Sequence, residues 1–291
     1  MINRALCASL LFCLGAFLTL GTAAQEKPAV FVSIPPQAWL VRKLAGGSVE
    51  VQTLLPAGAS PHTYEPSARQ VKRLSEAALF FTLGLPFETR LVLQAGRLNP
   101  ALRVVAMDAG IPKHGAGAHE HHGAEPGHVC AAGGDPHIWL SPCLLCAMAS
   151  NTVAALEAAL PQQGAALEEA FAKTLDEIRE TDEAVRARLR NAPVKTWVVY
   201  HPSWRYFAEA YGLSLLVLEQ DGKPPAARHL AEVIRHAKEV GVKVVFAEPQ
   251  YDVKPAQTLA AQLGARLELV DPLSEAWPSL MRDVAKRLAG D

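Results

Sequence analysis

The sequence predicts an α/β protein with two doubly wound lobes of mostly parallel sheet, joined by one long rigid helix. Segments of strand character alternate with segments of helix character up to about residue 111 and again from about residue 192. Such alternation is typical of parallel sheets that carry helices on both faces. A helical pattern much longer than any other separates the two series. At 291 residues, half of them hydrophobic, the chain is long enough for two moderate cores.

The first lobe is expected over residues 25–160, because short apolar runs in this region are bounded by turn residues. Pro35 begins a helix, Gly46-Gly47 ends it, and Ser67 is a typical N-cap for the next helix. The expected strands are 29–33, 49–55, 78–83 and 102–107, and the expected helices are 35–44, 68–76, 87–95 and 142–160.

A linker helix is expected over residues 161–191. Between residues 165 and 190 apolar side chains recur at helical spacing for about seven turns, which would give a helix roughly 40 Å long. A helix of this length can run the height of two lobes, and it holds too few heptads for a coiled coil. Its apolar positions are Leu167, Phe171, Leu175, Ile178, Val185 and Leu189.

The second lobe is expected over residues 192–291 and repeats the architecture of the first. Gly212, Gly241 and Gly264 each follow a helical segment, as glycines at helix C-termini do. His229 and His236 lie on one of these helices and are expected on its solvated face. The expected strands are 196–200, 213–218, 242–247 and 266–270, and the expected helices are 203–211, 227–240, 254–263 and 277–288.

Residues 1–24 are expected to be a cleaved export signal. A positive start through Arg4, an apolar stretch over residues 5–20 and small residues up to Ala24 match the regions of a signal peptide, with cleavage near Ala24. A transmembrane anchor is the alternative, but the apolar run is short and ends in small residues. Lipidation at Cys13 is disfavoured because Leu10-Leu11-Phe12 lacks the small residue that such sites usually need.

The charge balance and the motif content argue against two classes of function. The formal net charge is −1 at pH 7, so the chain has no basic excess with which to neutralise phosphates. Nucleic acid is therefore not expected as a partner. The sequence also lacks an HExxH motif or a comparable pairing of a metal ligand with a general base.

Residues 113–134 form a His-rich segment that is expected to be a mobile loop. Five histidines between Lys113 and His128 stand among Gly, Ala and Glu without apolar periodicity, so the segment cannot build a core. This concentration of imidazoles favours binding of Zn, Cu or Ni. The alternative is a surface insertion whose histidines have no role.

Removal of the leader would leave three cysteines, Cys130, Cys143 and Cys146. Cys143 and Cys146 have the CxxC spacing of a redox or zinc pair, but no second pair accompanies them and they follow a helix start at Ser141-Pro142. Two ordinary buried cysteines on one helix face are therefore the favoured interpretation. An oxidising compartment would permit a disulfide, and whether Cys130 bridges to either of the other two stays open.

Four metal-capable side chains occupy comparable positions, in proline-containing loops or just after strand-like runs: His62, His137, His201 and Asp271. Open α/β sheets bind ligands at the carboxyl ends of their strands. His62 and His137 would come from the first lobe, whereas His201 and Asp271 would come from the second. Three imidazoles and one carboxylate suit a tetrahedral zinc ion. The sequence therefore predicts a single metal ion, Zn²⁺, in the cleft between the lobes.

The most specific feature is a set of short motifs spread over nearly the whole chain after the leader. They are Pro61-His62-Thr63-Tyr64-Glu65-Pro66, Asp135-Pro136-His137-Ile138-Trp139-Leu140-Ser141-Pro142, His201-Pro202-Ser203-Trp204 with Tyr206-Phe207 and Tyr211-Gly212-Leu213, Phe246-Ala247-Glu248-Pro249-Gln250, and Asp271-Pro272-Leu273. Together they resemble the zinc-type solute-binding proteins of bacterial ABC importers, the ZnuA-like group.

This resemblance implies two α/β lobes joined by a long helix, with the ion between them and a His-rich loop before the second ligand. It implies ligand roles for His62, His137, His201 and Asp271. It further implies a periplasmic protein that captures zinc with high affinity and delivers it to a membrane permease with its ATPase. We expect a monomer. The disulfide that some members carry in the second lobe has no counterpart here, because no cysteine lies beyond Cys146.

Manganese is the main alternative cargo. Manganese members of the wider family tend to carry a carboxylate where this chain has His201, and an imidazole at that position favours zinc. Arg205 stands where a small residue is common, and its cation would either disfavour the metal or point to solvent. For the fourth ligand, Glu248 and water are alternatives to Asp271, and Glu65 is less favoured.

Two other classes of function share this site chemistry. A zinc hydrolase also uses three protein ligands and an open position for water, and Glu248 is the one candidate for its general base. A metallochaperone or an adhesin without a permease partner would have the same ligands. The expected function is zinc capture and delivery without catalysis.

Overall fold

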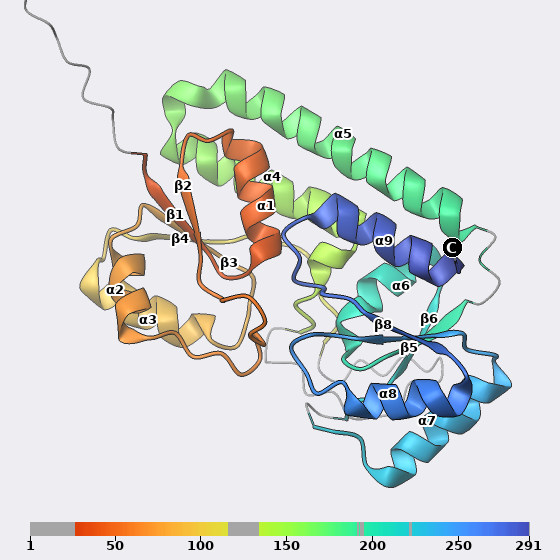
Figure 1. The fold of residues 1–291 in the computed structure, drawn as a ribbon. Coiled ribbons are helices and arrows are strands. Elements are labelled where there is room, and N and C mark those ends of the chain that lie inside the picture. Colours follow the sequence, from red (N-terminus) through yellow and green to blue (C-terminus); the bar gives the residue numbers. More distant parts are fainter. Residues whose placement is uncertain (1–26, 116–133, 191, 193–194, 221–222, 291) are drawn as a thin grey trace, which may run out of the picture.

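The computed structural model describes residues 27–115, 134–190, 192, 195–220 and 223–290. The predicted leader over residues 1–24 lies outside the described residues, as do Cys130 and residues 116–133 of the predicted His-rich loop. The described part forms two lobes, each built on one sheet, with long helices running beside them (Figure 1).

The first lobe is built on a sheet with the strand order β2-β1-β3-β4, in which every neighbouring pair is parallel. Parallel sheets are covered on both faces, so the central strands are buried and read as apolar runs. Strand β3, for example, is buried at all its positions. The strands are β1 (Ala29–Val32), β2 (Glu50–Thr53), β3 (Leu79–Thr82) and β4 (Arg103–Ala106), and the helices are α1 (Pro35–Ala45), α2 (Ala68–Ser75) and α3 (Glu88–Leu98).

The second lobe repeats this topology with the strand order β6-β5-β7-β8, again parallel throughout. The helix predicted over 203–211 begins with a short 3₁₀ turn, because the histidine before Pro202 keeps an extended backbone and the α-helix starts only at Arg205. The elements are β5 (Thr196–Val199), η3 (Pro202–Trp204), α6 (Arg205–Tyr211), β6 (Ser214–Val217), α7 (Ala227–Glu239), β7 (Val244–Ala247), α8 (Lys254–Leu263), β8 (Arg266–Leu269) and α9 (Trp277–Ala289). The prediction of two parallel α/β lobes is therefore confirmed.

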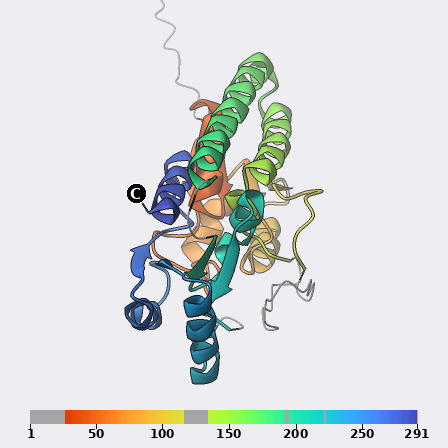
Figure 2. The ribbon, with the colours of Figure 1, turned by 90° about the vertical axis from the view of Figure 1, so that its right-hand side faces the viewer.

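Between the two sheets the chain forms η1 (Ile138–Leu140), α4 (Pro142–Ala159), η2 (Pro161–Gln163) and α5 (Gly164–Leu189). Helix α5 is the expected long helix, and it packs against α1, α4 and α9 (Figures 1 and 2). Among the described residues α4 alone is long and apolar enough to span a membrane by length and composition, but core helices pass the same test. The domain boundaries after residues 160 and 191 stay predictions.

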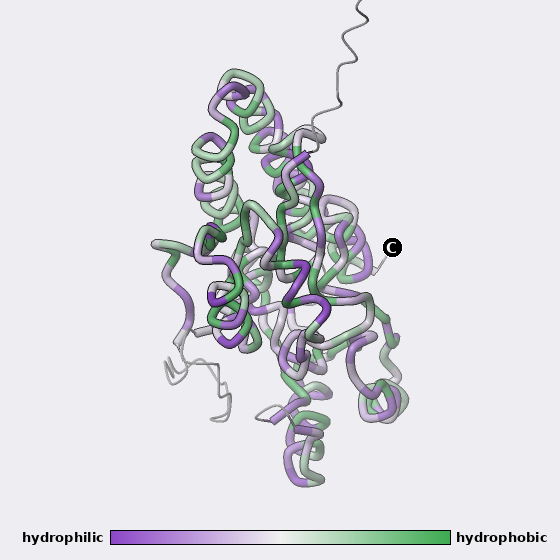
Figure 3. The backbone as a smooth tube through the Cα atoms, turned by 90° about the vertical axis from the view of Figure 1, so that its left-hand side faces the viewer, coloured by the Kyte–Doolittle hydropathy of each residue, from purple (hydrophilic) through white to green (hydrophobic). Residues whose placement is uncertain are grey.

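One hydrophobic core joins both lobes. It contains β1 and β3 of the first sheet, helices α1, α4, α5 and α9, and one face of the second sheet. A second cluster lies between the other face of the second sheet and helices α7 and α8. Hydrophobic and hydrophilic stretches alternate along the outer helices, as expected for helices with one buried face (Figure 3).

Two tryptophans link the lobes by hydrogen bonds beside the cleft. Trp139 of η1 donates through Nε1 to the carbonyl oxygen of Pro272 at 2.9 Å, and Trp277 of α9 donates to the carbonyl oxygen of Trp139 at 2.7 Å. Both indole rings are fully buried. A buried indole N–H needs an acceptor, so these two hydrogen bonds hold η1 against the segment after β8 and the start of α9.

Candidate metal centre

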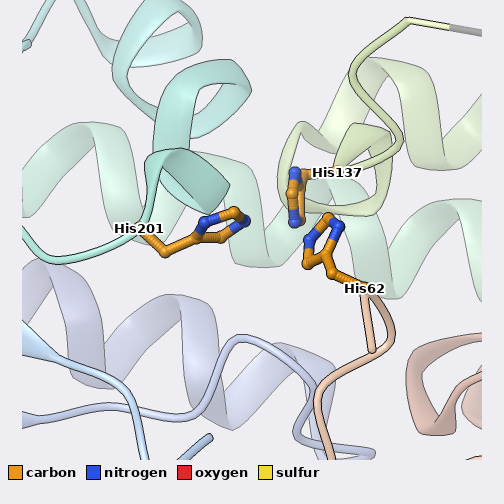
Figure 4. A group of neighbouring side chains, drawn as sticks. All are labelled: His62, His137 and His201. Carbon is orange, nitrogen blue, oxygen red and sulfur yellow. The ribbon is translucent and has the colours of Figure 1, made fainter. Parts of the chain in front are cut away.

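Three histidines from distant parts of the chain meet between the lobes: His62, His137 and His201. Each offers one ring nitrogen that lies within 4.8 Å of the nitrogens offered by the other two. The ring centroids are 5.7 Å apart for His62 and His137, 4.7 Å for His62 and His201, and 5.2 Å for His137 and His201. Figure 4 shows the three rings converging from three separate segments. Two nitrogens on one tetrahedral zinc ion lie roughly 3.3 Å apart, so small side-chain rotations suffice for coordination.

Each histidine lies in a segment that follows a strand. His62 lies between β2 and α2, His137 is the N-cap residue of η1 after β4, and His201 follows β5. A proline neighbours each histidine in the sequence and restricts the local backbone. The carboxyl ends of parallel strands therefore bring the three side chains to the facing edges of the two sheets.

His201 is held by a carboxylate on the far side of its ring. Its Nδ1 lies 2.8 Å from Oε2 of Glu219, and its Nε2 is buried without a hydrogen-bond partner among the described residues. Because a carboxylate accepts hydrogen bonds, Nδ1 carries the proton and Nε2 carries the lone pair that a metal needs. Burial lowers the pKa of His201, with a further lowering from His137, against the opposing effect of Glu219. The ring is thus a neutral, oriented donor.

His137 has the same arrangement with a different partner. Its Nδ1 lies 2.7 Å from Oδ1 of Asp135, which also accepts the backbone N–H of His137 at 3.0 Å. Burial raises the pKa of Asp135, but the charge and hydrogen bonds of His137 and the charge of Arg205 outweigh burial and lower it. Arg205 lies beside this carboxylate, with Nε 3.9 Å from Oδ2, and its side chain is 30% exposed. The cation therefore contacts the partner of a histidine rather than pointing away into solvent.

His62 is the exposed member of the three. Its ring nevertheless lies against the rings of His137 and His201, and the removal of water from that ring lowers its pKa to about 3. His201 and then His137 add to this lowering, because two protonated imidazoles would repel each other, while Asp135 opposes it. His62 is therefore neutral at pH 7 and available as a ligand.

Asp271 is not part of the group of three histidines, but its neighbours Gln250, Pro272 and Leu273 line the pocket that contains them. Its Oδ1 accepts a hydrogen bond from Nε2 of Gln250 at 2.7 Å and one from the backbone N–H of Leu273 at 2.9 Å. Because Asp271 holds the amide nitrogen of Gln250, the amide oxygen points elsewhere, and it is buried without a partner among the described residues. Whether Asp271 binds the metal stays a prediction.

A small pocket contains the three histidines and several groups from the second lobe. Glu248 lines it, is 2% exposed, and accepts a hydrogen bond from the hydroxyl of Ser203. Burial raises the pKa of Glu248 to about 8. Glu65, the less favoured acidic alternative, is exposed. The lining includes His62, His137, His201, Glu248, Gln250 and Tyr251.

Sequence reasoning missed two residues that act on His201. Glu219 binds its Nδ1, and the ring of Tyr251 stacks on it with centroids 5.2 Å apart. Glu219 comes just after β6, so the rule that led to the other residues would have placed it at this edge of the sheet but would not have predicted its contact with His201. Tyr251 carries no such signal, because its position depends on the fold of the β7–α8 segment.

Two interpretations of residues outside the centre are corrected by the structure. Cys143 is exposed and Cys146 partly buried, so the pair is not simply buried on a helix face, and both are free thiols. His236 is exposed as expected, but the prediction for His229 is wrong: it is 8% exposed, and its Nε2 lies 3.0 Å from the carbonyl oxygen of Val217.

Comparison with known families gives a match over almost the whole described region. The model of the family described as zinc-uptake complex component A, periplasmic, matches residues 30–290. The zinc-binding protein AdcA of Streptococcus pyogenes serotype M6 is 27% identical over an alignment of 265 residues, with coverage of 86% of this chain and 51% of AdcA. The chain thus spans about half the length of this curated relative.

Two further relatives are covered along most of their length. The high-affinity zinc uptake system protein ZnuA of Bacillus subtilis is 27% identical over 276 residues, with coverage of 92% of this chain and 86% of that protein. A crystal structure of ZnuA superposes with a TM-score of 0.82 at 32% identity and covers 91% of this chain and 98% of that chain. The similarity therefore includes both lobes and the segments that carry the three histidines.

Proposed function

The chain belongs to the family of the periplasmic component A of zinc-uptake complexes, ZnuA, and we propose that it captures Zn²⁺ with high affinity and delivers it to an ABC importer. The observation that carries this proposal is the convergence of His62, His137 and His201 between the lobes. The ion would be a cargo that is bound and released, and the protein would have no catalytic role.

The donor set supports zinc over manganese. Imidazole nitrogen suits zinc, whereas manganese prefers harder oxygen ligands. Two of the three rings, His62 and His201, have lowered pKa values and so need not release a proton at neutral pH when they bind a cation. Manganese and other divalent metals remain the alternative cargo that a competition experiment would detect.

We propose His62, His137, His201 and Asp271 as the ligands. Support for Asp271 comes from its position at the carboxyl end of β8, with Leu273 and Gln250 lining the pocket beside it. Glu248 and water are the alternatives for the fourth position. Glu248 would have to lose a proton first, because its pKa is raised to about 8.

The remaining parts of the proposal follow from the family and the sequence. The leader over residues 1–24 would direct export to the periplasm and be cleaved near Ala24. Residues 25–160 and 192–291 would form the two lobes, with residues 161–191 as the linker. The partner would be a membrane permease with its ATPase, and the protein would act as a monomer.

Zinc titration by calorimetry in the presence of a competing chelator tests the proposal. One tight site is expected in the full chain, and it should survive deletion of residues 114–128. His201→Ala should abolish tight binding, whereas His236→Ala, on the exposed face of α7, should leave it unchanged. Tight binding that persists in His201→Ala would show that the assigned site is wrong. Tighter binding of manganese than of zinc would replace the proposed cargo.

A further inference from the structure

Two cysteines lie apart from the metal centre at the start of α4. Pro142 is the first residue of this helix, so Cys143 and Cys146 both fall in its first two turns. Both are free, Cys143 is exposed, and Cys146 is partly buried. One thiol can therefore be reached from solvent while the other lies behind it.

Burial raises the pKa of the Cys146 thiol, and the charges of Cys143 and then of Asp182 on α5 raise it further. Exchange with an external disulfide is therefore expected to begin at the exposed Cys143.

The pair of thiols, Cys143 and Cys146, is poorly suited to hold a metal ion. Structural zinc sites take four ligands, and a soft site needs at least a third donor beside two thiolates. Over the described part of the chain, the three histidines are the one group of three or more ligating side chains within reach of each other. Thiol chemistry is the remaining use of two cysteines at this spacing.

We propose that Cys143 and Cys146 are a redox-active dithiol that closes to an intrachain disulfide by exchange with an external disulfide. The proposal concerns a site separate from the metal centre and does not depend on the proposed transport function.

The exchange takes two steps. First, the Cys143 thiolate, which has lost its proton to water, attacks one sulfur of the external disulfide; a mixed disulfide forms and the other external sulfur leaves as a thiolate. Second, Cys146 gives its proton to water and attacks Sγ of Cys143. The Cys143–Cys146 bond forms, and the second external sulfur leaves as a thiolate. The chain loses two electrons, and the external disulfide is reduced to two thiols.

Helix geometry makes this disulfide reversible. Residues three apart on an α-helix have Cβ atoms about 5–6 Å apart, whereas a disulfide needs about 3.5–4.5 Å. The first turn must therefore tighten toward 3₁₀ geometry. That turn is lightly restrained, because the first amides of a helix have no intrahelical acceptor and the Ser141 side chain makes no capping hydrogen bond. The resulting strain makes the bond easy to reduce.

Equilibration of the metal-free full chain with mixtures of oxidised and reduced glutathione tests the pairing, with alkylation read at each cysteine by mass spectrometry. Cys143 and Cys146 should become protected together, in a peptide lighter by two hydrogens, and reduced glutathione should restore both thiols. In Cys146→Ser the mixed disulfide with glutathione should accumulate on Cys143, and in Cys143→Ser it should form on Cys146 at least about tenfold more slowly. Two thiols that stay free, or linkage of either to Cys130, would overturn the pairing.

Discussion

The Nδ1 atom of His201 lies 2.8 Å from Oε2 of Glu219, with both side chains buried. This contact fixes the tautomer of the ring and leaves its second nitrogen facing the other two histidines. It also places a negative charge behind the ligand, where it increases the electron density that the ring can donate. Glu219 thus prepares His201 for a cation before any cation is bound.

Glu219→Gln should weaken zinc binding by about 10- to 100-fold, the usual effect of removing a carboxylate behind a metal-bound histidine. The amide can still accept a hydrogen bond from Nδ1, so the ring keeps its place and the loss reflects the missing charge. Competition calorimetry measures the change. Glu232→Gln, on the exposed face of α7, is the matched control. An unchanged zinc affinity in Glu219→Gln would mean that Glu219 positions the His201 ring but that its charge does not strengthen zinc binding.

The fourth ligand can be identified by comparing two carboxyl substitutions. Asp271→Asn should weaken zinc binding by about tenfold or more, while Glu248→Gln should change it less. The physical reason is that Glu248 carries a proton near neutral pH, its pKa being raised to about 8 by burial, and it already accepts the hydroxyl of Ser203.

Cobalt is a suitable probe for this comparison, because its visible absorption reports the coordination geometry. In Asp271→Asn the spectrum should change, and in Glu248→Gln it should not. The reverse pattern would assign the fourth position to Glu248. Unchanged spectra in both variants would leave water as the fourth ligand.

Arg205→Gln should strengthen zinc binding by about two- to fivefold, the range expected for a partly exposed ion pair. Arg205 lies 3.9 Å from Asp135, which holds His137, so its positive charge both opposes the cation and weakens the carboxylate. The gain should shrink at high salt because exposed charges are screened. Zinc titration at two salt concentrations, with Arg228→Gln as an exposed control on α7, measures it. Weaker binding in Arg205→Gln would instead mean that Arg205 holds Asp135 in place.

The fold was predictable because its signals are local and repeated. Apolar runs marked all eight described strands, and a serine cap and terminal glycines marked helix ends, as at Ser67 and Gly264. The packing of α9 against α5 and the hydrogen bond from Trp277 to Trp139 were not predictable, because they join residues far apart in sequence. The buried position of His229 could have been found, since it lies on the same helix stripe as Val233 and Ala237.

The three histidines were predictable for a topological reason. Parallel strands of one sheet end at the same edge, so residues after different strands are brought together whatever lies between them. The partners of those histidines were harder to predict. The hydrogen bonds that His137 donates to Asp135, two residues earlier, are local. The approach of Glu219 to His201 instead depends on the pairing of β6 with β5 and on side-chain rotamers.

Without metal, the protein should lose stability as the pH falls below about 6.5. The pKa of His62 is lowered from 6.5 to about 3 in the folded state, and that of His201 is also lowered. Between pH 6.5 and pH 3 the unfolded chain therefore binds more protons than the folded chain. The free energy of unfolding then rises with pH across this window and becomes independent of these two groups above it. Thermal melts of the metal-free protein between pH 7 and pH 5 measure the slope.

His62→Gln should reduce that slope, because a side chain that cannot be protonated no longer favours the unfolded chain at low pH. His236→Gln, at an exposed position, is the control and should keep the slope of the parent. Added zinc should raise the melting temperature most at pH 7 and progressively less toward pH 5, since protons compete with the ion for the same imidazole nitrogens. A slope that is the same in His62→Gln as in the parent would show that the ring of His62 does not lie against the other two rings in solution.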